Sequence, residues 1–187
     1  MALVSRKAAS FFLLVVMVLS ALGVYNSQPD NSVKYNGFTF NPIGTGWQVR
    51  VNNQQYQFLH LPTELDFPQI TLPQAEKVYV AYDPSAKNIT VPLGQVSGLL
   101  LQFGMRAIPA CIQENGCPPD LPVISCDTAN ALVLYFRSAE EKQVLHQDQC
   151  TIIQAPTSLD FEKAVEKMAY QLVGIMSRDK INEDKNE

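Results

Sequence analysis

The side chains that could carry out acid–base chemistry are few and scattered. The chain has only two histidines, His60 and His146. His60 lies in an apolar run that is typical of a strand, which favours a structural role. His146 lies in a polar stretch, which favours a surface position. The spacing of these residues assigns no reaction, and the catalytic residues stay unknown at this point.

Sequence motifs of common catalytic and phosphate-binding sites are not matched. Residues 95–98 contain a serine but lack the first glycine of the G-x-S-x-G turn of hydrolases. Residues 44–46 lack the lysine of a phosphate-binding loop. Two pairs of neighbouring carboxylates fall in predicted loops, where solvated charge is their usual role: Glu64 with Asp66, and Glu140 with Glu141. We therefore predict no cofactor.

The four cysteines are Cys111, Cys117, Cys126 and Cys150. An even number in an exported chain, which the N-terminal segment below indicates, favours disulfides. Cys111 and Cys117 enclose a polar turn with an Asn-Gly pair, so we predict that these two are bonded and that Cys126 is bonded to Cys150. A zinc site that includes His146 is the alternative, but the tight C-x2-C spacing of structural zinc sites is missing. We predict no bound metal; free core thiols are the third possibility.

The N-terminal segment indicates export. Arg6 and Lys7 precede an uncharged stretch at residues 8–25. As a helix this stretch would be about 27 Å long, close to the hydrocarbon thickness of a bilayer. The basic pair favours a cytoplasmic N-terminus. We predict a cytoplasmic segment at 1–7, a transmembrane signal-anchor at 8–26 and a C-terminal domain outside the cell membrane.

A cleaved signal peptide is the competing interpretation of the same segment. Residues 21–23 match a small-x-small cleavage site. The apolar stretch is longer than the usual core of a signal peptide, which favours the anchor. Both interpretations export the domain. Asn88 begins an Asn-Ile-Thr sequon and is a possible glycosylation site in an exported loop.

The apolar pattern beyond the anchor predicts one α+β domain at residues 35–177. It follows a polar linker at 27–34 and precedes a charged, disordered tail at 178–187. Strands are predicted at 35–40, 47–51, 56–61, 77–82, 131–136 and 150–154, and helices at 94–108 and from about Ser158 to Met176. Hairpin-like turns dominate, so we expect a mainly antiparallel sheet with one or two packed helices.

The last helix has the clearest pattern. Its apolar stripe, which includes Leu172, is expected to face the sheet. The remaining positions are expected to face solvent: Glu162, Lys163, Glu166 and Lys167.

Three segments of the chain resemble an uncharacterised family of archaeal proteins that have a single membrane-spanning anchor and an exported domain. The first is residues 35–40, Tyr-Asn-Gly-Phe-Thr-Phe, followed by Trp47. The others are residues 150–153, Cys-Thr-Ile-Ile, and residues 170–176, Tyr-Gln-Leu-Val-Gly-Ile-Met. The resemblance implies the placement and the fold, and it assigns no functional residue.

The composition excludes one class of function and leaves two. The net charge is −4 and no basic run is present, which argues against nucleic-acid binding. We expect a membrane-tethered extracytoplasmic interaction or structural module that is not an enzyme and has a protein partner. The alternative is an extracytoplasmic enzyme whose site is assembled from scattered residues. A deep pocket with a histidine and a carboxylate would favour the enzyme, and a flat apolar patch would favour the module.

Overall fold

The computed structural model divides the chain into two compact units, Met1–Val33 and Lys34–Glu187. The residues that it describes are 31–73, 75–84, 91–127 and 129–176. Among them, no helix has the length and apolarity needed to cross a bilayer. The predicted anchor at 8–26, the sequon at Asn88 and the tail at 178–187 lie outside the described residues.

A four-stranded antiparallel sheet comes first, in the order β1-β2-β3-β4. Its strands are β1 (Val33–Tyr35), β2 (Phe38–Ile43), β3 (Gly46–Val51) and β4 (Gln54–Phe58). The predicted single strand at 35–40 is wrong, because Asn36 and Gly37 take positive φ values of 47° and 81° and form a turn between β1 and β2. Asn-Gly is the preferred pair for such two-residue turns. β1 also begins inside the predicted linker.

The second sheet has five strands in the order β6-β5-β7-β9-β8. They are β5 (Lys77–Tyr82), β6 (Arg106–Cys111), β7 (Leu132–Ser138), β8 (Gln143–Gln147) and β9 (Cys150–Ala155). The pairings of β5 with β6, β5 with β7 and β7 with β9 are parallel, and only β8 with β9 is antiparallel. The fold is therefore α+β with one antiparallel and one mixed sheet, and the expectation of a mainly antiparallel sheet is wrong for this half.

The described residues form two α-helices, α2 (Leu93–Gln102) and α3 (Ser158–Val173). A short 3-10 turn lies at Pro62–Glu64. The predicted helix at 94–108 is too long at its C-terminal end, because Gly104 reverses the chain at φ 74° and β6 follows. Pro109, which directly follows the predicted helix, lies within β6. β6 is an edge strand, where a missing backbone donor is tolerated.

The ends of α3 are set by local hydrogen bonds. The Thr157 hydroxyl accepts the backbone N–H of Asp160 at 3.2 Å, which satisfies one of the free donors of the first turn. Gly174 adopts φ 84° and ends the helix, and the N–H of Ile175 returns to the carbonyl of Tyr170 at 3.0 Å. The helix therefore ends at Val173, three residues before its predicted end at Met176. Ile175 is nevertheless buried.

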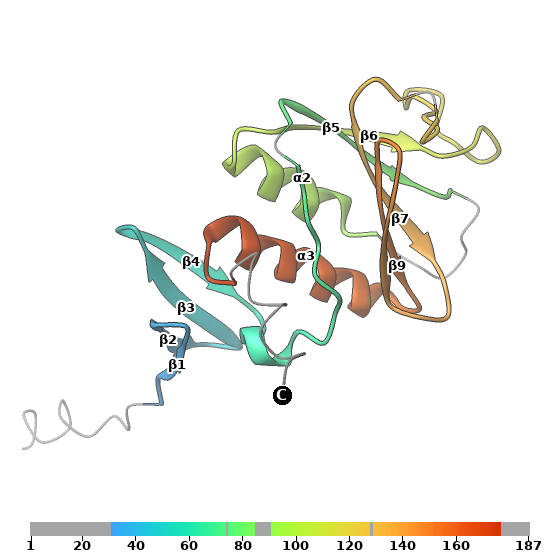
Figure 1. Cartoon of the computed structure of the whole chain (residues 1–187). Coiled ribbons are helices and arrows are strands. Elements are labelled where there is room, and N and C mark those ends of the chain that lie inside the picture. Colours follow the sequence, from blue (N-terminus) through green and yellow to red (C-terminus); the bar gives the residue numbers. More distant parts are fainter. Residues whose placement is uncertain (1–30, 74, 85–90, 128, 177–187) are drawn as a thin grey trace, which may run out of the picture. The chain divides into compact units, whose positions relative to one another are not determined.

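Both helices cover the same face of the five-stranded sheet (Figure 1). Val78 and Leu134 of that face meet Leu100 of α2 and Met168 of α3 in the main core. The opposite face is covered by the segment between β6 and β7, which contributes partly buried residues such as Ile124. The two disulfides hold this covering segment at its ends.

The cysteine pairing is the predicted one. Cys111 is bonded to Cys117, with a Cα–Cα distance of 5.9 Å. Cys126 is bonded to Cys150, with a Cα–Cα distance of 5.4 Å. The second bridge ties the covering segment to β9, an inner strand of the mixed sheet between β7 and β8. The cysteines are therefore not zinc ligands in this structure.

Removing the second bridge should destabilise the domain more than removing the first. The bridges join residues 24 and 6 positions apart. The chain-entropy relation assigns them about 3.5 and about 2.4 kcal/mol. We expect the Cys126→Ala/Cys150→Ala variant to unfold at lower urea concentration than Cys111→Ala/Cys117→Ala. Equal midpoints, or the reverse order, would contradict the role given to the Cys126–Cys150 bridge.

Candidate functional site

Helix α3 contacts both sheets. Phe161, Ala164 and Met168 are buried in the core against the five-stranded sheet. Tyr170 points to the other sheet, where its ring stacks on Phe58 with the centroids 3.8 Å apart. The positions of the four-stranded sheet and of α3 are therefore fixed relative to each other by aromatic packing.

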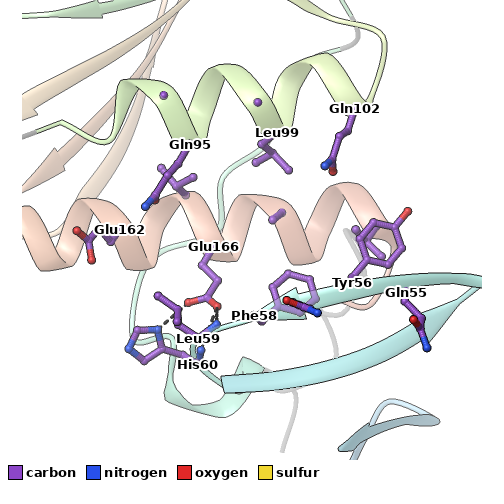
Figure 2. Close-up of a pocket in the computed structure, with 16 residues that line it drawn as sticks. Gln55, Tyr56, Phe58, Leu59, His60, Gln95, Leu99, Gln102, Glu162 and Glu166 are labelled. Carbon is purple, nitrogen blue, oxygen red and sulfur yellow. Dashed lines mark hydrogen bonds and ion pairs between the residues drawn. The ribbon is translucent and has the colours of Figure 1, made fainter. Parts of the chain in front are cut away.

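The carboxylate of Glu166 fastens the end of β4 to α3 (Figure 2). It accepts the backbone N–H of Leu59 and, at 3.0 Å, that of His60. Its second oxygen lies 2.6 Å from Nδ1 of His60. Since a carboxylate accepts, Nδ1 carries the proton, and Nε2 of a neutral imidazole is left as an acceptor.

Tyr170 adds a further bond to the same segment. Its hydroxyl donates to the carbonyl of His60 at 2.7 Å. Burial, followed by repulsion from the carboxylates of Glu166 and Glu64, raises the pKa of Tyr170 well above its ordinary value. The tyrosine therefore acts as a neutral hydrogen-bond donor, and both its ring and its hydroxyl hold β4 to the helix.

The expectation that Glu166 and Lys167 face solvent is wrong. The side chain of Glu166 is only 12% exposed. The ammonium of Lys167 donates to the backbone carbonyls of Leu65 and Phe67 in the loop after β4. Burial lowers the pKa of Lys167, and the charge of Asp66 opposes this shift. The side of α3 that contacts the segment after β4 is thus polar, and the apolar periodicity of the sequence wrongly assigned it to the solvent.

A groove of about 720 Å³ lies between β4, α2 and α3 (Figure 2). Gln95, Leu99 and Gln102 project into it from α2. The remaining lining residues come from β4 with the two residues after it, from the glycines of α2, and from α3: Gln55, Tyr56, Gln57, Phe58, Leu59, His60, Gly94, Gly98, Glu162, Val165, Glu166, Ala169 and Val173.

The lining residues have a limited chemistry. The floor is largely apolar, with Val165, Ala169 and Val173 of α3. Among the described residues, the acidic and basic groups that line the groove are His60, Glu162 and Glu166, and the lining has one hydroxyl, that of Tyr56. None of the described lining residues is a serine, threonine, cysteine, lysine or arginine. The groove therefore suits an uncharged or basic ligand with apolar side chains.

The other residues considered from the sequence lie outside the groove and have structural or surface roles. His146 is exposed on β8, with Nδ1 3.3 Å from the hydroxyl of Thr151. Glu64 accepts the N–H of Leu61 at 2.7 Å. Asp66 pairs with Lys142 at 2.7 Å, and this hydrogen bond and charge lower the pKa of Asp66. Glu140 and Glu141 are exposed near the start of β8.

The described residues contain no cluster of three or more histidine, cysteine or acidic side chains that could hold a metal ion. Of the groove residues, the sequence singled out only His60. Glu166 was missed because it occupies a polar helix position, and nothing in its spacing distinguishes a buried carboxylate from a solvated one. The Gln-rich β4 carried no chemical signal either.

No protein-family description, curated protein or solved structure gave a significant match to this chain.

Replacing Glu166 should destabilise the domain far more than replacing His60. Glu166→Ala leaves two backbone donors and the imidazole without their acceptor, which should cost about 2–4 kcal/mol. His60→Ala keeps both backbone bonds to Glu166 and should cost less than about 1.5 kcal/mol. Glu162→Ala, one turn earlier, should change the free energy of unfolding by less than about 0.5 kcal/mol. Urea denaturation measures all three, and equal losses for the two glutamates would contradict the fastening role.

Tyr170 should make the domain sensitive to alkali. Its folded-state pKa is raised, so above the unfolded value of about 10 the unfolded chain loses a proton that the folded chain keeps. The contribution of Tyr170 to the free energy of unfolding is complete below about pH 10 and is lost as the pH rises above this value. Tyr170→Phe should lose about 1 kcal/mol at pH 7 and show a shallower decline from pH 10 to 11.5. Tyr56→Phe, whose hydroxyl bonds to Gln54, is the control and should keep the wild-type slope.

Proposed function

We propose that this chain is a membrane-tethered module of the extracytoplasmic space that binds a partner protein in the groove between α2, α3 and β4. The groove itself carries the proposal. Its volume of about 720 Å³ falls within the usual range for binding sites. Its floor is apolar, while the amides of Gln95 and Gln102 project into it from α2, so it can bury side chains and still form hydrogen bonds.

Exposed apolar area at the groove supports a protein ligand. Leu59 is 58% exposed although it lines the groove. Leu99 and Val173 add further partly exposed apolar surface. An exposed apolar patch rimmed by polar residues is typical of an interaction site. Burying this apolar patch against a partner would remove it from water, which lowers the free energy of the complex.

Placement outside the cell membrane is part of the proposal. The two disulfides support it, because such bonds persist in oxidising compartments. The apolar stretch at residues 8–25 supports a tether. The resemblance to archaeal membrane-anchored proteins implies the same arrangement. A membrane tether would raise the effective concentration of the domain relative to partners that are held at the same membrane.

A second candidate function rests on the His60–Glu166 pair. An imidazole oriented by a carboxylate is the arrangement of a general base. Because none of the described lining residues is a serine, threonine or cysteine, the pair would act on water rather than on a side-chain nucleophile. The bonds of Glu166 to the backbone of Leu59 and His60 explain the pair structurally. Hydrolysis of p-nitrophenyl esters that His60→Gln abolishes and Glu162→Gln retains would favour this enzyme over the binding module.

Photo-crosslinking in native membranes tests the binding module. A photoreactive phenylalanine analogue replaces Leu99, which lines the groove, in the full-length chain. The control carries it at Leu101, which is 70% exposed and absent from the groove lining. We expect a discrete adduct from position 99 alone, in a fraction that resists carbonate extraction. Adducts of equal yield at both positions, or none at position 99, would overturn the groove as the binding site. Release of an N-terminally shortened chain by carbonate would overturn the tether.

A further inference from the structure

One side of the groove is the free edge of a sheet. β4 is the outer strand of the four-stranded sheet, and in the part of the chain that the structure describes its strand neighbour is β3. Residues 55–58 of β4 line the groove, followed by Leu59 and His60. A sheet edge exposes backbone donors and acceptors that can pair with another extended chain.

The register shows which backbone groups of β4 point away from β3. The hairpin turns at Asn52 and Asn53, which both have positive φ, and Val51 faces Gln54. In a two-residue hairpin this first pair exchanges hydrogen bonds, and every second pair along the strands does so again. Gln55 and Gln57 lie between those pairs. Their N–H and C=O groups therefore point to the free edge.

The exposed edge ends where Glu166 begins to supply acceptors. The N–H groups of Leu59 and His60 are bonded to its carboxylate. The edge that is open to a ligand is thus β4 itself, five residues from Gln54 to Phe58. At a strand rise of about 3.4 Å per residue this edge is roughly 17 Å long.

The groove has the length of such a strand. On its floor the lining residues of α3 run from Glu162 to Val173. These eleven helical steps of about 1.5 Å span roughly 17 Å. On the α2 side, a Cβ built on Gly94 or Gly98 would meet nothing within 4 Å. The absence of side chains at these two positions leaves room for a chain between α2 and β4.

We infer that the groove receives an extended segment of the partner, which pairs with β4 as a fifth strand of the sheet. This inference rests on the function proposed above and specifies the form of the ligand. Alternate side chains of the segment would face the same way as Tyr56 and Phe58, towards the apolar floor at Val165 and Ala169. The segment should therefore have apolar residues at every second position, as in strand addition elsewhere.

The charge of the groove restricts the remaining positions of the segment. Glu162 lies on the lining and no lysine or arginine does, in a chain of net charge −4. An acidic segment would meet like charge without a counterion. The segment should carry polar, uncharged or basic residues between its apolar ones.

Peptide selection followed by backbone methylation tests the inference. The full-length chain in detergent micelles is used to select binders from a phage-displayed library of random heptapeptides. We expect enriched sequences that alternate apolar with uncharged or basic residues. Synthetic copies are then N-methylated at one position at a time. In a paired strand, alternate N–H groups face β4, so methylation at every second position should weaken binding about tenfold or more, and the positions between should tolerate it.

A pair of tryptophan variants separates the two levels of the proposal. Gly98→Trp fills the groove from α2, whereas Leu101→Trp places the same side chain on an exposed position outside it. Loss of peptide binding in Gly98→Trp alone, with the alternating methylation pattern, supports both proposals. The same loss with a uniform or helical methylation pattern keeps the binding module and overturns strand addition. Binding that Gly98→Trp leaves intact, or no enriched peptide, overturns both.

A second copy of this chain is the rival occupant, since its own β4 is also an extended segment. Sedimentation of the full-length chain without peptide distinguishes it. We expect a single species whose mass does not depend on protein concentration. A dimer that the selected peptide dissociates would show that a second copy occupies the edge, and would overturn the inference of a foreign strand.

Discussion

Helix α3 must be buried on two sides at once, and the arrangement of the domain depends on this requirement. Its apolar side, with Phe161 and Met168, completes the core under the five-stranded sheet. Its other side contacts the four-stranded sheet and the segment after it through the ring of Tyr170, stacked on Phe58, and through the partly buried carboxylate of Glu166. Burying a carboxylate is costly unless its oxygens are hydrogen-bonded. The backbone at the end of β4 supplies those bonds, so the helix and the strand end are held together.

The same contact leaves the rest of β4 uncovered. The strand is hydrogen-bonded to α3 only where it ends, and α2 runs alongside α3 on the other side of the groove (Figure 2). The short helix α2 and its two glycines do not fill the space. The domain therefore combines a groove floor that belongs to the packed core helix α3 with an open backbone edge. A floor that is already folded before a ligand binds needs little ordering, so more of the contact energy appears as affinity.

The sequence predicted what local patterns determine. The disulfide pairing followed from a turn and from exclusion, and most strands and both helices were found from apolar periodicity. The direction of the strands in the mixed sheet was not found, because it depends on long connections that no local pattern specifies, such as the one through α2 between β5 and β6. The continuous apolar run of β7, from Leu132 to Phe136, is typical of a parallel strand buried on both faces and was the available signal. Glu166 could not be recognised, since only the tertiary fold brings β4 beside that helix position.

The composition of β4 has a consequence for the protein when this sheet edge is uncovered. Residues 52–58 read Asn-Asn-Gln-Gln-Tyr-Gln-Phe, without charge, proline or glycine. Uncharged glutamine- and asparagine-rich segments of this length stack into cross-β fibrils when their edges meet. The many natural devices against such stacking, such as edge lysines and bulges, are not found on β4. The uncovered β4 edge is therefore the segment of the described sheets that most resembles a fibril-forming sequence, and a strand paired with it as proposed would also block such stacking.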